Sequence, residues 1–434
     1  MANGIREEHQ SIKGMPDILP EEVVWWRYIE NCLLNLMDQY GYQQIRLPLL
    51  EKTALFKRAV GEATDIVEKE QMFSFLDEKK RSLSLRPEGT AGCVRSCIEH
   101  SLLRQLPQRL WYLGPMFRYE SPQKGRQRQF HQLGVECFGI ANWEVEVEQI
   151  AMFFRLWKQL QLDESIQLEI NNLGTAAVRK IYSKELVFYF EKHQNQLDSD
   201  SQRRLYTNPL RILDSKNPEM KDLIEGAPKL YDYLDSESLT NYQACKEQLL
   251  SLGIKFIENS KIVRGLDYYT GIVWEWTSNL LGAQSAVGGG GRYDGLVEEL
   301  GGNSVPAVGQ ALGLERVMIL LKHRNNSPTN NLDGYLICVG PNASLKKFAI
   351  AEKIRDIYPN LNFIVDLSGG NFKNQFKRAD QSGARLALIL GEDEINSNSI
   401  TIKYLRENLS DSDKKQQVTV KLEDLVNVFM ANGW

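Results

Sequence analysis

The stretch FRYESPQKGRQRQFHQLGVE places basic side chains in one short loop between two apolar runs, and these are Arg118, Lys124, Arg126 and Arg128. Gln132 and Glu136 lie in phase along the second run. Guanidinium groups bind oxyanions strongly, while an amide and a carboxylate can bind a cation or a ring nitrogen. Because a lone surface arginine is usually solvated, these residues indicate a ligand site only if other segments supply matching groups.

Two junctions between a predicted strand and a predicted helix carry further polar groups. The segment LRPEGT contributes Glu88, Gly89 and Thr90, which on their own are explained by capping of the helix N-terminus through Glu88 or Thr90. The segment GLERVMILL places Arg316 in the first turn of a helix, where phosphate groups are favoured. Taken alone, that arginine is equally well explained as a solvated or ion-paired residue.

Two later segments contain tyrosines, and one of them also contains a run of four glycines. VRGLDYYTGIVWE places Arg264 beside Tyr268 and Tyr269, which a regular strand would point to opposite faces. The four consecutive glycines in AVGGGGRYDGL have no Cβ atoms. Such a run is tolerated where a ligand or a neighbouring strand approaches the backbone closely. The run matches neither GxGxxG nor the Walker pattern, so it does not predict a phosphate loop.

Considered jointly, these distant segments predict one pocket with two unlike ends. Arginines would form a cationic end suited to phosphates: Arg118, Arg264 and Arg316. Acidic or uncharged polar groups would form an end suited to an ammonium or a protonatable ring: Glu88, Thr90, Gln132, Glu136 and Tyr269. The pattern therefore indicates a site for a nucleotide together with a small cationic molecule.

Apolar periodicity indicates which elements must position these residues. Residues 23–40 have helical spacing, YQQIRLPLLE alternates like a strand, and Pro48 argues for an edge position. Further strand candidates are SLSLRPEGT, RLWYLGPMFRYE and FHQLGVECFG, followed by the amphipathic helix WEVEVEQIAMFFRLWKQL. Because no regular βαβ crossovers join these strands, they predict an antiparallel sheet with flanking helices.

Changes in composition and in apolar periodicity along the chain predict its domains. Residues 1–325 form the first domain, interrupted by a polar helical insertion over about 175–252. KHRNNSPTNNLDG has the composition of a linker, which we place at 326–331. Residues 332–434 alternate short apolar runs with helical patterns and predict a separate α/β domain. On the helix around residues 372–382, a solvated face and nucleic-acid contact explain Lys373, Lys377 and Arg378 equally well.

Composition excludes several classes of protein. The chain has 434 residues, of which 42% are hydrophobic and 25% charged, as in ordinary globular proteins. No apolar run approaches the roughly 20 residues of a membrane span, and no signal peptide is visible, so we expect a cytoplasmic protein without membrane contact. The 6 cysteines form no CxxC pair and only 5 histidines accompany them, so we expect neither disulfides nor a metal site. The net charge of −4 confines any polyanion contact to local patches.

The quoted segments resemble the histidyl-tRNA synthetases, which are class II aminoacyl-tRNA synthetases. GYQQIRLPLLE is similar to class motif 1, FRYESPQKGRQRQFHQLGVE to motif 2 and GQALGLERVMIL to motif 3. The two signatures that distinguish this family are similar to RGLDYYTG and GGGGRYDGL. The resemblance implies an α+β and α/β multidomain fold: a class II antiparallel sheet with flanking helices, a helical insertion and a C-terminal α/β anticodon-binding domain. It also implies a homodimer, with motif 1 at the interface.

The same resemblance implies an activity and a role for each residue. A ligase of this family activates L-histidine with ATP and Mg²⁺, then transfers it to tRNA(His). Arg118 and Arg264 would be catalytic, and ATP would contact Arg118, Glu120 and Arg316. Histidine would be bound by Glu88, Gly89, Thr90, Arg118, Gln132, Glu136, Arg264, Tyr268, Tyr269 and Tyr293. The acceptor end of tRNA would be bound by Lys124, Arg126, Gln127 and Arg128.

A binding protein of the same fold is the alternative. The regulatory subunit of ATP phosphoribosyltransferase resembles these enzymes but senses histidine without catalysis. Such chains typically lack the anticodon-binding tail and part of the ATP-binding arginine set, whereas both are present here. A threonine enzyme would need a Cys/His zinc constellation, which the sequence lacks. The sequence therefore favours the ligase.

Overall fold

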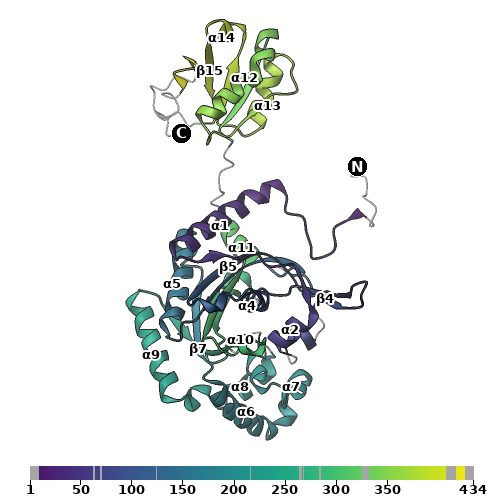
Figure 1. Cartoon of the computed structure of the whole chain (residues 1–434), viewed down its shortest axis with the longest axis vertical. Coiled ribbons are helices and arrows are strands. Elements are labelled where there is room, and N and C mark those ends of the chain that lie inside the picture. The colour runs from purple at the N-terminus through teal and green to yellow at the C-terminus, as the bar shows by residue number, and fades with distance from the viewer. Residues whose placement is uncertain are drawn as a thin grey trace. The chain divides into compact units, whose positions relative to one another are not determined.

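The computed structural model divides the chain into two compact units, Met1–Ser327 and Pro328–Trp434 (Figure 1). It describes residues 9–61, 64–68, 71–123, 125–215, 217–262, 266, 268–282, 285–324, 332–406 and 417–425. The linker predicted at 326–331 and the charged stretch around 408–416 lie outside these ranges. Within them, every helix is too short or too polar to cross a membrane.

A large, mostly antiparallel sheet forms the centre of the first unit. Its order is β1 (Gln43–Gln44), β5 (Gln108–Phe117), β6 (Gln129–Phe138), β11 (Ala307–Gly313), β10 (Ala286–Arg292), β9 (Thr270–Thr277), β7 (Gln167–Asn172) and β8 (Phe256–Glu258). The strands from β5 to β7 pair antiparallel, which confirms the predicted sheet. The two edge strands differ from that prediction, because β1 and β8 pair in parallel with their neighbours.

The segment YQQIRLPLLE does not form the single strand that its alternation predicts. It splits into β1 and β2 (Leu50–Lys52), and Pro48 lies between them. β2 belongs to a separate small sheet with β4 (Ser82–Leu85) and β3 (Ser74–Leu76). Proline has no amide hydrogen to donate to a strand ladder, so it is tolerated at the break between two short strands.

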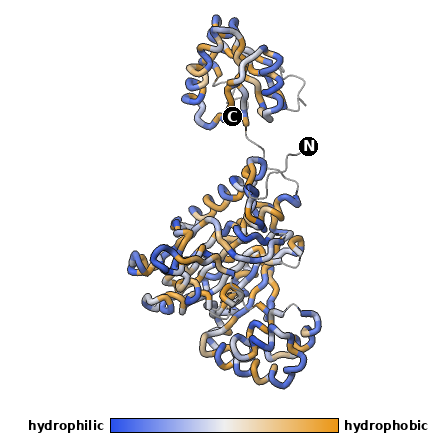
Figure 2. The backbone as a smooth tube through the Cα atoms, turned by 90° about the vertical axis from the view of Figure 1, so that its right-hand side faces the viewer, coloured by the Kyte–Doolittle hydropathy of each residue, from blue (hydrophilic) through white to orange (hydrophobic). Residues whose placement is uncertain are grey.

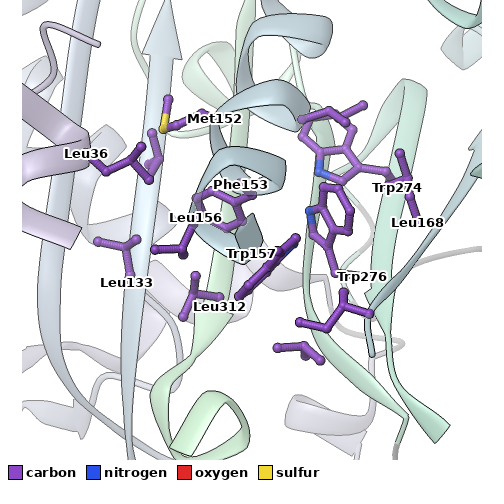
Figure 3. Close-up of a cluster of buried hydrophobic side chains, with 14 of the residues drawn as sticks. Leu36, Leu133, Met152, Phe153, Leu156, Trp157, Leu168, Trp274, Trp276 and Leu312 are labelled. Carbon is purple, nitrogen blue, oxygen red and sulfur yellow. The ribbon is translucent and has the colours of Figure 1, made fainter. Parts of the chain in front are cut away.

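Helices cover one face of the large sheet: α1 (Pro20–Gln39), α5 (Glu144–Gln159), α9 (Ser236–Ser251) and α11 (Leu314–His323). The core between them is strongly aromatic, and the rings of Trp157 and Trp276 meet edge to face at 5.9 Å (Figure 3). Strand β6 sends Leu133, Val135 and Cys137 into this core. Side chains alternate along a strand, so Gln132, Gly134 and Glu136 must lie on the opposite face.

The opposite face of the sheet has small residues at its centre. Gly134 lies opposite Ala311 on β11, and Gly309 lies between Glu136 on β6 and Gly291 on β10. Site side chains fill the space above these small residues: the Tyr112 ring lies over Gly134 and the Glu136 carboxylate lies over Gly309. The glycines of this face, which we call the floor of the site, therefore make room for Tyr112 and Glu136.

Helices follow β7 and pack against this second face. They include α6 (Ala176–Glu191), α7 (Ser199–Arg204), η4 (Pro209–Asp214) and α8 (Lys221–Glu225), and the chain returns to the sheet through α9. Hydrophobic and hydrophilic residues alternate along these helices, as expected for amphipathic segments (Figure 2). Their buried residues, including Tyr182, Leu186 and Phe190, share one core with helix α4 (Thr90–Glu99) and with strand β5.

A buried ion pair joins β10 to helix α5. Arg292 donates from Nε to Glu146 Oε1 at 2.7 Å and from its terminal nitrogens to Glu146 Oε2 at 2.8 Å, the Ile140 carbonyl and the Asn142 carbonyl. Glu146 is 1% exposed. This bidentate pair lies next to Tyr293 in sequence and fixes the end of β10.

We expect Glu146→Ala to lower the free energy of unfolding of the first unit by about 3–5 kcal/mol, because the buried Arg292 charge would lose its bidentate partner and keep, among the described carboxylates, only the half-exposed Asp294, at 3.2 Å. Urea unfolding followed by tryptophan fluorescence would measure this loss. Replacing both partners with methionine is expected to cost less than Glu146→Ala alone, since no buried charge would remain. A double variant as unstable as the single one would contradict this explanation.

The second unit is a small α/β domain with its own core. Its sheet order is β13 (Phe363–Val365), β12 (Gly334–Cys338), β14 (Leu386–Leu390), β15 (Ser399–Tyr404) and β16 (Gln417–Lys421). The first three strands pair in parallel and the last two join antiparallel. Helices α12 (Pro341–Ile357), α13 (Phe372–Gln381) and α14 (Glu392–Asn396) complete it. On α13, Arg378 pairs with Asp366 at 2.8 Å, while Lys373 and Lys377 are exposed.

Candidate active site

A buried carboxylate lies at the centre of this second sheet face. Glu136 is 1% exposed, and its Oε1 accepts hydrogen bonds from Thr90 Oγ1 at 2.8 Å and from the Tyr112 hydroxyl at 2.9 Å. Its Oε2 accepts a short hydrogen bond from the Tyr293 hydroxyl. Burial raises the pKa of Glu136 to about 7, while the three hydroxyl donors act to lower it. The carboxylate therefore changes charge near neutral pH.

Three tyrosines form an aromatic wall beside Glu136. The ring centroids of Tyr268 and Tyr269 are 4.7 Å apart, and Tyr293 lies 5.5 Å from the first and 6.4 Å from the second. The regular strand on which opposite directions for Tyr268 and Tyr269 depended does not include these residues. Strand β9 begins only at Thr270, so the two tyrosines lie in the preceding turn, where both rings can be buried together.

The segment LRPEGT delivers Glu88 and Thr90 to the same region. The Glu88 carboxylate accepts from the backbone N–H of Thr90 at 2.6 Å and of Ala91 at 3.0 Å, so it satisfies the first turn of α4. Burial raises the pKa of Glu88, and these backbone donors act to lower it. The capping interpretation is thus correct for Glu88, whereas Thr90 directs its hydroxyl to Glu136 instead. Glu88 and Thr90 are linked through the Thr90 backbone N–H, and Gly89 is the N-cap residue between them.

Strand register places Gln132 near the same floor. Gln132 lies opposite Gly114 on β5 and Gly313 on β11, so neither neighbour contributes a side chain beside it. It shares its face of β6 with Glu136, as their spacing predicts. The sequence pattern does not single out Tyr112 on β5, which lies opposite Gly134 on β6 and donates to Glu136. An aromatic residue in an apolar strand gives no signal that distinguishes it from ordinary core.

Arginines gather at the other end of the site. Arg118 donates from Nε to the Pro87 carbonyl at 2.9 Å, and its guanidinium lies 5.3 Å from the centre of the Phe130 ring. Arg316, in the first turn of α11, donates from Nε to the Gly125 carbonyl at 3.1 Å and also to the Ala286 carbonyl. Burial lowers the pKa of Arg316, and the charges of Arg126 and Arg118 lower it further. These guanidinium groups are close enough to repel one another, as expected where an anion binds.

Hydrogen bonds between Glu315 and His131 hold α11 against β6. The Glu315 carboxylate accepts from the His131 backbone N–H at 2.9 Å and 3.0 Å, and its Oε1 lies 3.0 Å from His131 Nδ1. Sequence reasoning also missed this contact, because it depends on the packing of two elements far apart in the chain. It fixes the helix turn that carries Arg316 relative to the strand that carries Glu136.

Two arginines of the loop between β5 and β6 contact other residues of the same loop. Arg126 pairs with Glu120 at 2.6 Å, and Arg128 donates to the Glu120 carbonyl at 3.1 Å while lying 4.0 Å from the Tyr119 ring centre. Gln127 is half-buried. Two of the residues predicted to function here, Lys124 in this loop and Arg264, lie outside the described residues.

The four-glycine run is explained by a neighbouring strand. A Cβ at Gly288 or Gly290 would lie closer than 3.0 Å to the carbonyl oxygens of Ala311 or Gly309 on β11. A Cβ at Gly291, on the site face, would lie 3.0 Å from Cδ1 of Tyr269. Glycine is therefore needed at this run so that β11 and the tyrosine wall can approach β10.

The described residues contain no group of three or more His, Cys, Asp or Glu side chains placed to hold a metal ion. All six cysteines are free thiols, and five of them are buried. Among acidic groups at the cationic end, Glu275 on β9 acts through its charge to raise the pKa of Arg316.

Known proteins match nearly the whole chain. The family model described as histidyl-tRNA synthetase matches residues 14–317, and that described as anticodon binding domain matches residues 334–432. The chain is 52% identical to a histidine-tRNA ligase from Methylobacillus flagellatus, over 93% of its length and 96% of that protein. It is 51% identical to one from Hydrogenovibrio crunogenus, over 92% of its length and 93% of that protein.

A solved structure agrees with these matches. The structure of the apo histidyl-tRNA synthetase from S. aureus matches with a TM-score of 0.79 and 36% identity, covering 97% of this chain and 99% of that one. It confirms the class II fold predicted for the first unit. The chain therefore belongs to the histidyl-tRNA synthetase family.

Proposed function

We propose that this chain activates L-histidine with ATP and transfers it to the 3′ end of tRNA(His). The observation that carries the proposal is the pairing of unlike ends in one site: a buried carboxylate with a tyrosine wall, and a group of close arginines. The first end suits an imidazole ring and the second suits a triphosphate. Residues 1–325 would perform both chemical steps, and residues 332–434 would bind the anticodon stem.

In the first step, a carboxylate oxygen of histidine attacks the α-phosphorus of ATP. The new P–O bond forms as the bond to pyrophosphate breaks, giving histidyl-adenylate. The substrate carboxylate is already ionised at neutral pH, so the protein need not supply a base. Arg118 and Arg264 would stabilise charge on the α-phosphate, Arg316 would bind the γ-phosphate and Glu120 would lie near adenine. Catalysis then consists of positioning and charge stabilisation.

Selectivity for histidine would come from the polar end. Glu136 would accept from the imidazole ring, with Tyr268, Tyr269 and Tyr293 enclosing it. Each carboxylate oxygen can accept more than one hydrogen bond, so Glu88 can cap α4 and still bind the α-ammonium. Gly89, Thr90 and Gln132 would complete that ammonium subsite.

We propose that Mg²⁺ enters with ATP and that Glu275 contacts it. Mg²⁺ in nucleotide sites is typically held by phosphate oxygens together with one or two carboxylates. Glu275 acts electrostatically on Arg316, which supports its placement near the same phosphates. The ion would neutralise charge on the departing pyrophosphate.

In the second step, a terminal ribose hydroxyl of tRNA attacks the acyl-adenylate and AMP leaves. The loop residues Lys124, Arg126, Gln127 and Arg128 would bind the acceptor end. We also propose a cytoplasmic homodimer with the motif 1 segment at its interface. Exposed apolar residues at and near that segment support this surface: Tyr28, Leu34, Leu49 and Leu50.

Arg126→Ala is expected to raise the KM for tRNA about tenfold while adenylate formation changes less, because the lost charge would face the nucleic acid. Aminoacylation and histidine-dependent ATP/pyrophosphate exchange measure the two steps separately. Arg155→Ala, at an exposed arginine of α5, is the matched control. An equal loss in both steps would place Arg126 in the ATP subsite through its pair with Glu120 instead.

Amino-acid-dependent ATP/pyrophosphate exchange tests the proposed function. We expect exchange with histidine and with no other standard amino acid, and loss of that exchange in Arg264→Ala. Histidine binding without exchange in the unaltered protein would overturn the proposal and favour a histidine-sensing regulatory subunit.

A further inference from the structure

Tyr112 occupies a space that two glycines from different elements leave open. A Cβ added to Gly89, before α4, or to Gly134, on β6, would lie closer than 3.0 Å to atoms of the Tyr112 ring. The tyrosine is 1% exposed. Two glycines from separate elements thus make room for one ring, and any other residue at either glycine would displace that ring. This indicates that the fold requires the Tyr112 ring at this position.

The hydroxyl of Tyr112 ends beside the groups that would recognise the substrate ring. It donates to Glu136 Oε1 at 2.9 Å and lies 3.4 Å from Thr90 Oγ1. Tyr112 therefore connects three elements: β5, which carries it, β6, which carries Glu136, and the start of α4, which carries Thr90. Loss of the hydroxyl would leave Thr90 as the one described donor to Oε1.

Few charged groups face Glu136 in the described part of the chain. The titratable groups around it are Tyr112, Tyr293, Tyr268, Glu88 and Cys93. Glu88 is acidic like Glu136, and burial raises the pKa of the tyrosines and of Cys93, so these groups stay neutral at pH 7. The ionised form of Glu136 is therefore supported by hydroxyl dipoles, and each of them matters more than it would beside a cation.

We propose that Tyr112 is a positioning residue for histidine: its hydroxyl orients the Glu136 carboxylate and keeps it an acceptor, and Gly89 and Gly134 exist to admit its ring. The proposal rests on the proposed function of Glu136 as the group that reads the imidazole. Tyr112 acts through Glu136 and is not assigned a contact with the substrate.

Tyr112→Phe tests this role because it removes one oxygen and keeps the ring. Loss of a hydrogen bond to a charged group corresponds to about a tenfold or larger weakening, so the KM for histidine in exchange should rise about tenfold at pH 7 while the KM for ATP changes less than about twofold. Removing a donor that lowers the Glu136 pKa lets that pKa rise. The loss should accordingly be larger at pH 6.5 than at pH 8.5, relative to the unaltered enzyme at each pH.

Two controls separate positioning from packing. Tyr182→Phe removes a buried hydroxyl that donates to the Pro228 carbonyl outside the site, and it should leave the KM for histidine unchanged. Gly134→Ala would push the ring away and should weaken histidine binding as Tyr112→Phe does. Gly92→Ala adds a Cβ to α4 whose nearest contact is an ordinary 3.6 Å, and it should have no such effect.

The outcomes distinguish this inference from the function on which it rests. If the unaltered protein shows no histidine-dependent exchange, the proposed function itself fails. If exchange is normal and Tyr112→Phe changes the KM for histidine by less than twofold, or changes it equally at pH 6.5 and 8.5, Tyr112 is a packing residue and the inference is overturned. Histidine binding by calorimetry without ATP provides the same comparison if a variant loses catalysis.

Discussion

Glu136→Ala should lower kcat/KM for histidine by about 10³-fold or more, because sites built around buried hydrogen-bonding groups discriminate by about 10⁴ to 10⁵ when the matching group is missing. The substitution also leaves the hydroxyls of Thr90, Tyr112 and Tyr293 without the acceptor that all three now share. Unpaired buried donors add their own desolvation cost. ATP/pyrophosphate exchange at varied histidine measures the loss, and the KM for ATP should change by less than about threefold.

Glu136→Gln separates charge from shape in the same assay. Glutamine keeps one acceptor oxygen but no charge, so its loss should be smaller than that of alanine. Glu99→Ala, at an exposed carboxylate of α4, is the matched control and should retain activity. Loss of ATP and histidine affinity to the same degree in Glu136→Ala would indicate collapse of the floor, and the assignment to the imidazole subsite would then be wrong.

The pH dependence of the unaltered enzyme follows from the same carboxylate. Burial raises its pKa to about 7, so it is ionised above that pH and protonated below it. Since the ionised form is the better acceptor, kcat/KM for histidine should fall as pH decreases through 7. Free histidine also titrates near pH 6.5, so the comparison with Glu136→Gln at each pH isolates the contribution of the enzyme.

Much of the fold follows from apolar periodicity. RLWYLGPMFRYE and FHQLGVECFG are long alternating runs separated by a polar loop, and they form the β5–β6 hairpin at the centre of the sheet. The strand pairing of short apolar runs is harder to predict from their own sequence. YQQIRLPLLE alternates, yet its ends pair with different sheets, because each end finds a different strand as its neighbour.

Site residues can be predicted when their chemical type alone indicates a function. They cannot be predicted when their role depends on how neighbouring strands are aligned. Separate segments predict Glu136 and Thr90, the family resemblance adds Tyr293, and the structure joins all three through hydrogen bonds. Tyr112 was missed because its meaning comes from Gly134 across the hairpin and from Gly89 in another element. A glycine that makes room for a ring can be interpreted only once the strands are aligned.

Arg118→Ala should reduce kcat for histidine-dependent exchange by about 10²- to 10³-fold, the usual loss when one donor to a developing oxyanion is removed. The geometry favours a role in the transition state. Its Nε binds the Pro87 carbonyl and its plane lies over Phe130, so the guanidinium is oriented before substrate arrives. Burial lowers its pKa, and the charges of Glu120 and Glu88 oppose that change, so the group stays cationic.

Arg118→Lys decides whether charge alone is sufficient. Lysine keeps the charge but cannot reproduce a planar fork held at Nε, so we expect it to recover only a small part of the lost kcat. Arg95→Ala, at an arginine of α4 that is ion-paired with Glu99, is the control for loss of a cation in the same unit. Full activity in Arg118→Lys would mean that a point charge serves the α-phosphate. In that case the orientation of Arg118 by Pro87 and Phe130 would have no part in catalysis. Arg264 and Arg316 would then provide most of the stabilisation of the transition state.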